Sequence, residues 1–210
     1  MKAKRSGFLI IGGLVVILGL VAMASVLSSR HEEPLPVLAT LPPFALVEAS
    51  GETVRRDDLA GSPWVADLVF THCAGICPRM TAEMGRLERQ TTDLPGLRFV
   101  SISVDPERDT PEVLSAYAER VGARRDRWLW LTGERDTIWK LASEGFLLPL
   151  AEGNPEMGDD DIIHSQYFVL LDGGARIRGV YDVRDSEAML KLRGDVRRLH
   201  DEDENERGST

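Results

Sequence analysis

The longest apolar stretch of the chain runs from Phe8 to Leu27 and contains no charged side chain. At about 1.5 Å per residue, a helix of this length spans roughly 30 Å, the thickness of the hydrocarbon core of a bilayer. Three basic residues precede it, which predicts that the N-terminus stays in the cytoplasm and that the rest is exported. We therefore expect residues 1–27 to be a membrane anchor. The small residues around Met23 suggest the alternative, a cleaved signal peptide.

The pattern after this stretch predicts one folded domain. Residues 28–42 are polar and then spaced by prolines, which is typical of a linker. The domain is expected to span residues 43–200. Residues 201–210 are rich in acidic side chains, and this composition predicts a disordered tail.

Apolar runs and helical spacing alternate along the domain. Short apolar runs predict strands at residues 63–70, 97–104, 128–131, 166–171 and 175–181. Helical spacing of apolar residues predicts helices from Pro78, from the Thr110-Pro111 start signal, over 137–146, and through Leu192 and Leu199. The order β-α-β-α-β-α-β-β-α predicts an α/β fold. Its central sheet should be mainly parallel, with helices on both faces and a terminal β-hairpin.

The charge balance excludes one class of partner. Three of the 25 basic residues lie in the first five positions, and no acidic residue precedes the apolar stretch. The part after residue 27 therefore carries 22 basic and 34 acidic residues, a net charge of −12. Because nucleic-acid phosphates need a basic surface, we expect no nucleic-acid partner.

The chain contains only two cysteines, Cys73 and Cys77, and they stand where the first predicted strand turns into a helix. Open α/β sheets place their chemistry at this carboxyl end of a strand. A bridge between them would close too small a loop to staple the fold, so redox or metal chemistry is favoured. A helix N-terminus stabilises a thiolate, which predicts a lowered pKa for Cys77. The two sulfurs should lie close enough to form a disulfide or to bind one soft ion.

Several other side chains are candidates for the same site. His164 precedes a predicted strand and is a candidate metal ligand, with a core or surface histidine as the alternative. Asp67 and Asp109 lie on segments that should approach the cysteines. Structural roles are favoured for both, Asp67 accepting from a buried donor and Asp109 helping to cap the helix that starts at Pro111.

These motifs together closely resemble the Sco/SenC proteins, which are copper-binding assembly factors for cytochrome c oxidase. The resemblance rests on residues 64–78, which contain the CxxxCP motif, on residues 103–111 (SVDPERDTP), and on His164-Ser165. It covers the chain from about Pro43 to His200. It implies a thioredoxin-like fold in which Cys73, Cys77 and His164 bind one copper ion. Two thiolates and an imidazole suit copper, as Cu(I) or Cu(II), by softness and affinity order.

Two functions follow from this resemblance. The first is a copper chaperone, which is not an enzyme, serving the binuclear copper site of cytochrome c oxidase subunit II. The second is a thiol–disulfide reductase that keeps the cysteines of that subunit, or of other exported proteins, reduced. Either function needs a thiol reductant outside the cytoplasm, and the first also needs a copper donor there. The expected location is the bacterial inner membrane, with a single span and the domain facing the periplasm or outer side.

Overall fold

The computed structural model describes residues 33–73, 75–148, 150–151 and 165–208. The predicted anchor and His164 lie outside these ranges. No helix within the described ranges is long and apolar enough to cross a membrane.

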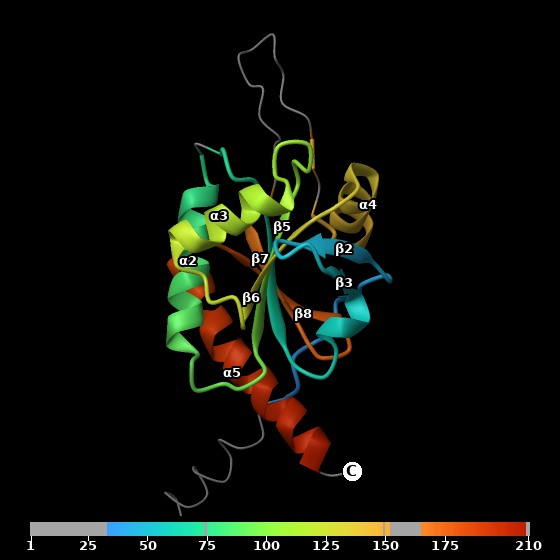
Figure 1. The fold of residues 1–210 in the computed structure, drawn as a ribbon. Coiled ribbons are helices and arrows are strands. Elements are labelled where there is room, and N and C mark those ends of the chain that lie inside the picture. Colours follow the sequence, from blue (N-terminus) through green and yellow to red (C-terminus); the bar gives the residue numbers. More distant parts are fainter. Residues whose placement is uncertain (1–32, 74, 149, 152–164, 209–210) are drawn as a thin grey trace, which may run out of the picture. The chain divides into compact units, whose positions relative to one another are not determined.

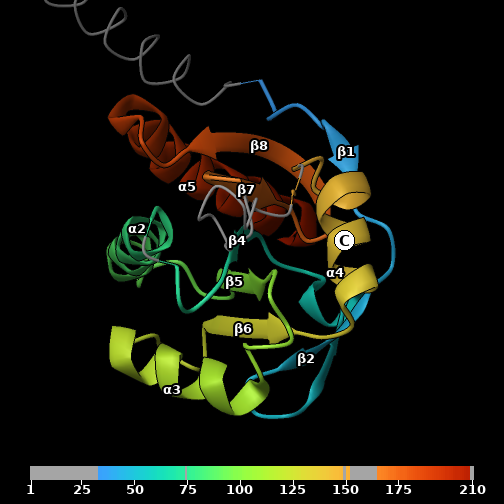
Figure 2. The ribbon, with the colours of Figure 1, turned by 90° about the horizontal axis from the view of Figure 1, so that it is seen from above.

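The described residues form one sheet in the order β1-β8-β7-β4-β5-β6-β2-β3 (Figures 1 and 2). The strands are β1 (Ala39–Thr40), β2 (Ala45–Glu48), β3 (Thr53–Arg55), β4 (Trp64–Val69), β5 (Arg98–Ser103), β6 (Trp128–Thr132), β7 (Tyr167–Leu171) and β8 (Arg176–Asp182). Every residue of β4 is buried, as expected for an apolar run at the centre of a sheet.

The sheet is mixed, whereas the sequence predicted a mainly parallel one. Only β4, β5 and β6 pair in parallel. The β2–β3 and β7–β8 hairpins pair antiparallel within themselves and with their inner neighbours, and β1 adds to β8 in the same sense. Two hairpins and one short strand therefore flank a parallel core of three strands, which corrects the expectation.

The helices are η1 (Arg56–Leu59), α2 (Cys77–Gln90), α3 (Pro111–Val121), α4 (Arg135–Lys140) with the π-helical turn η2 (Leu141–Gly145), and α5 (Ser186–Gly208). Two of them, α2 and α3, begin at the proline signals that the sequence offers. Thr110 caps α3 by accepting a hydrogen bond from the Val113 N–H, and Gly122 ends it in the left-handed region with φ 73°. Figure 2 shows α2 and α3 on one face of the sheet and α4 on the other, so the expected coverage of both faces is observed.

The end of the expected linker takes part in the sheet. The Leu38 and Leu41 N–H groups donate to the carbonyls of Ile177 and Ala175 at 2.8 and 3.0 Å, and β1 lies between them. Leu35 is buried. Backbone hydrogen bonds to β8 thus extend the ordered domain upstream of residue 43, because an edge strand can pair with little help from its own side chains.

The acidic C-terminal residues continue α5 as far as Gly208, whereas their composition predicted a disordered tail. Glu202 explains part of this difference. Its carboxylate accepts from Arg178 at 3.1 Å and from the Leu35 N–H at 3.4 Å. Arg178, itself buried, also donates to the Leu35 carbonyl and to Asp172. Tertiary contacts therefore hold the first turn of the acidic segment.

Candidate metal and redox site

The cysteine pair lies at the carboxyl end of β4. Residues 70–72 lead from the strand to Cys73, and Cys77 is the first residue of α2. The Cys73 side chain is half-buried, whereas Cys77 is only 1 % exposed. A hydrogen bond joins the two thiols. The predicted proximity of the sulfurs is therefore observed.

The predicted lowering of the Cys77 pKa is wrong. Burial raises the pKa of the Cys77 thiol far above its ordinary value. A hydrogen bond from the Phe70 backbone opposes this rise of the pKa, and Cys73 and the nearby Asp67 add to it. Desolvation disfavours the charged thiolate more strongly than the helix N-terminus favours it.

This asymmetry predicts that the two thiols react at different rates. In the reduced, metal-free protein at pH 7, Cys73 should be alkylated by iodoacetamide at least about tenfold faster than Cys77, because only an accessible thiolate reacts. Mass spectrometry of peptides after short labelling times measures both rates in one sample. Equal labelling in Cys73→Ser and Cys77→Ser single-thiol variants would contradict the difference in burial.

A buried aspartate fixes the loop that carries Cys73. Asp109 Oδ1 accepts from the Thr71 hydroxyl at 2.5 Å, and Oδ2 accepts from the Thr71 N–H at 3.0 Å. Oδ2 also accepts from the Ser103 hydroxyl at 2.6 Å. The sequence predicted that Asp109 approaches the site, which is confirmed. Its predicted role as a helix cap is wrong, because Thr110 supplies the cap.

His72 ties the same loop to the segment after β5. Its Nε2 lies 2.6 Å from Arg108 Nη1 and 3.3 Å from Asp105 Oδ2. Its ring packs on Phe70 with centroids 4.7 Å apart. Burial raises the pKa of Asp105, although His72 and Arg108 oppose this rise. The two sequence motifs around Cys73 and after Ser103 therefore meet at one place.

Asp67 begins a hydrogen-bond chain across the three parallel strands. The Ser101 hydroxyl donates to Asp67 Oδ1 at 2.6 Å, and the Trp128 Nε1–H donates to Ser101 Oγ at 2.9 Å. Oδ2 of Asp67 is buried without a hydrogen-bond partner among the described residues. Burial raises the pKa of Asp67 from 3.8 to about 7, although Ser101 opposes the rise. The predicted buried donor is Ser101, which sequence reasoning did not name.

The complete ligand set remains a prediction. His164 lies outside the described residues, so the structure does not place it beside the cysteines. Within the described part of the chain, no three histidine, cysteine, aspartate or glutamate side chains cluster closely enough to hold a metal ion. Two adjacent thiols nevertheless form the core of a soft-metal site or of a reversible disulfide.

Comparison with known proteins identifies the family. The SCO1/SenC family model matches residues 33–198. This chain belongs to the SCO1/SenC family. A putative copper-binding protein of Stutzerimonas stutzeri is 32% identical over 82% of this chain and 81% of its own length. The resemblance inferred from the cysteine motif is thereby confirmed.

Solved structures of Sco proteins share the fold. A SCO1/SenC lipoprotein of Bacillus anthracis is 30% identical, with a TM-score of 0.71 over 78% of this chain and 96% of its own. BsSco, a cytochrome c oxidase assembly protein with a disulfide switch, is 29% identical, with a TM-score of 0.69 over 80% and 98%. Copper-bound yeast Sco1 is 25% identical, with a TM-score of 0.58 over 73% and 86%. The fold is therefore thioredoxin-like, as these Sco proteins are.

Proposed function

We propose that this protein is a copper chaperone. It binds one copper ion through Cys73, Cys77 and His164, for the binuclear copper site of cytochrome c oxidase subunit II. The observation that carries the proposal is the hydrogen-bonded thiol pair at the end of β4, in a chain of the SCO1/SenC family. The copper in yeast Sco1 and the copper-binding relative support the choice of metal.

The chemistry of the side chains fits copper as cargo. Thiolates and imidazole are the ligands that soft Cu(I) prefers, and Cu(II) also accepts imidazole. Cys73 is half-buried, so one thiol of the pair is accessible to a partner. Asp109 and Asp105 hold the neighbouring residues Thr71 and His72, which keeps the Cys73 loop in place.

A thiol–disulfide reductase is the second candidate function. One accessible and one buried thiol is the arrangement that dithiol exchange uses, with the accessible sulfur attacking first and the second resolving the mixed disulfide. The disulfide switch in BsSco supports this candidate. Pure dithiol exchange has no need of His164, and this residue therefore separates the two functions.

The cellular setting belongs to the same proposal. Residues 8–27 anchor the chain in the bacterial inner membrane, and the domain lies on the outer side, where a copper donor and a thiol reductant reach it. The apolar stretch and the basic residues before it support this orientation. The related SCO1/SenC protein of Bacillus anthracis is a lipoprotein.

The decisive variant is His164→Ala. It should weaken copper binding by at least about tenfold while leaving the Cys73–Cys77 disulfide able to form. The reason is that the imidazole completes the proposed metal site but takes no part in the sulfur–sulfur bond. Oxidase assembly under copper limitation should then fail in His164→Ala cells as it does in Cys73→Ser cells. Copper titration of the purified variant and oxidase activity of membranes measure the two effects.

His72→Ala is the matched control, since this histidine adjoins Cys73 but contacts Asp105 and Arg108. Its copper affinity should stay within a few-fold of the parent. If His164→Ala cells assemble normal oxidase while Cys73→Ser cells do not, the protein acts by thiol exchange and the chaperone proposal is wrong.

A further inference from the structure

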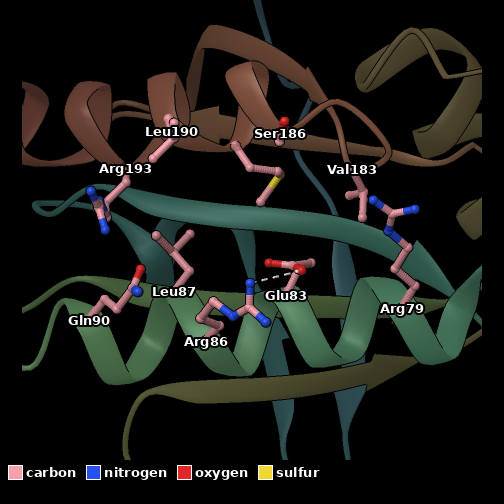
Figure 3. A pocket seen from close by; sticks show the side chains of 10 residues that line it. Arg79, Glu83, Arg86, Leu87, Gln90, Val183, Ser186, Leu190 and Arg193 are labelled. Carbon is pink, nitrogen blue, oxygen red and sulfur yellow. Dashed lines mark ion pairs between the residues drawn. The ribbon is translucent and has the colours of Figure 1, made fainter.

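A groove of about 310 Å³ lies between α2 and α5 (Figure 3). Its lining residues recur at intervals of three or four along α2 and along α5, so one face of each helix forms a wall. Arg79, in the first turn of α2, stands at one end, and Gln90 lies at the other. At about 1.5 Å per residue this length of α2 is roughly 16 Å. Arg79 follows Cys77, the first residue of α2, by two residues, so this end of the groove lies within one helical turn of Cys77 along the chain.

The groove has an apolar lining that reaches the surface. Leu87 on α2 is buried, and Leu190 on α5 is 61% exposed, more than any other large apolar side chain of the described residues. Both line the groove, together with Met189 and Val183. An apolar side chain of a partner that packs against this lining would be removed from contact with water, and this burial favours association.

Arginines dominate the charged side chains of the groove. Arg79, Arg86 and Arg193 line it, against the single carboxylate of Glu83. Glu83 is already paired with Arg86 at 3.3 Å. Arg193 is half-buried and makes no ion pair or hydrogen bond with any described residue. In a chain with a net charge of −12 after residue 27, this positive groove is suited to an acidic ligand.

A glycine extends the groove along α5. A second hollow, which shares Gln90, Leu190 and Arg193 with the groove, is also lined by Gly194 and Arg197. A β-carbon at Gly194 would meet no atom within 4 Å, so the packing of this chain does not require glycine there. Glycine within a helix costs up to about 1 kcal/mol relative to alanine. The absent side chain leaves room for the backbone of a docked segment.

We propose that this groove binds a segment of the protein that receives copper. The segment is acidic and carries apolar side chains on one side. That protein's identity as oxidase subunit II rests on the proposed function. The arginines bind the acidic side chains, Leu190 and Leu87 contact the apolar ones, and the partner is brought to the cysteine pair at the Arg79 end. An anionic membrane is the less favoured occupant, because a flat surface along α5 would also meet the acidic residues 201–204, whereas a single segment can follow the groove alone.

Equilibrium binding to the soluble copper-site domain of subunit II tests the docking site. Calorimetry with the reduced, metal-free protein should show saturable binding that weakens with salt. Arg193→Glu should raise Kd at least about tenfold, and Gly194→Leu at least about threefold because it fills the groove without removing a charge. Arg125→Glu is the matched control: this exposed arginine contacts Ser115 away from the groove, and its Kd should stay within about twofold.

Each other outcome overturns the proposal. These are absence of binding by the parent protein, unchanged binding by Arg193→Glu, and an equal loss in Arg125→Glu. Binding to phosphatidylglycerol vesicles that Arg193→Glu abolishes, without binding to the subunit II domain, identifies a membrane instead. Circular dichroism confirms that each variant is folded. Copper uptake by the same preparations reports separately on the proposed function, since that function fails if the reduced parent protein takes up no copper.

Discussion

The reduced protein is expected to bind one copper ion per chain, and the oxidised protein is expected to bind none tightly. With the proposed ligand set, a disulfide between Cys73 and Cys77 would remove both thiolates at once and leave at most the imidazole of His164. The loss of affinity should be on the order of 1,000-fold or more, about 4 kcal/mol. Anaerobic titration against a competing chelator, with spectroscopy to identify thiolate coordination, measures both states.

Single substitutions separate this expectation from a general effect of oxidation. Cys73→Ser and Cys77→Ser should each lose tight binding although neither can form the intramolecular disulfide. Stoichiometric, tight binding by the oxidised parent protein would show that the cysteines are not the ligands. The burial of Cys77 adds a kinetic expectation: copper should reach Cys73 before it reaches Cys77.

The contribution of Asp67 to the stability of the metal-free, reduced domain is expected to fall as the pH rises from about 4 to about 7. The pKa of this carboxyl is about 7 in the folded chain, against an ordinary value of 3.8. Between these values the unfolded chain releases the proton while the folded chain retains it, so raising the pH favours unfolding. Below pH 3.8 the contribution of Asp67 to stability is fully present, and above pH 7 it is lost. The difference between the two pKa values corresponds to about 4 kcal/mol in the free energy of unfolding.

Asp67→Asn should remove this pH dependence, since the amide resembles the protonated acid and its oxygen still accepts from Ser101. Urea unfolding at several pH values, compared between parent and variant, isolates Asp67 from the other carboxyl groups. The variant should be the more stable protein at pH 8. Asp57→Asn, at an exposed side chain, is the control and should follow the parent. A constant stability difference between Asp67→Asn and the parent across the pH range would refute the shifted pKa.

The central elements were predictable because each carries a local signal. The run around Asp67 is apolar on both faces, and Pro78 and the Thr110-Pro111 pair mark helix starts. The strands β1 to β3 carry no such signal. They have two to four residues each, and β1 depends on its hydrogen bonds to β8 rather than on its own apolar pattern.

At the cysteine site, prediction from the sequence failed for a different reason. Sequence position places Cys77 at a helix N-terminus, but its pKa is set by burial, which depends on residues far away in the chain. Likewise, Asp109 is next to a helix start in the sequence, yet its carboxylate binds Thr71, 38 positions upstream. Spacing along the chain predicted which segments meet. It did not predict which side chains pair, because pairing depends on strand alignment and packing.

The two serine–aspartate pairs of β5 have a consequence for how the chain folds. In the observed alignment Asp67 of β4 lies opposite Ser101, and Val69 lies opposite Ser103. A slip of two positions, which keeps the apolar faces matched, would place Asp67 opposite Phe99 or opposite Ser103. The first slip leaves the buried Asp67 carboxyl without a hydrogen-bond donor. In the second, Ser103 donates to Asp67 and its hydrogen bond to Asp109 is lost. We expect these pairs to penalise misaligned collapse of the parallel strands, so that the chain reaches one native register.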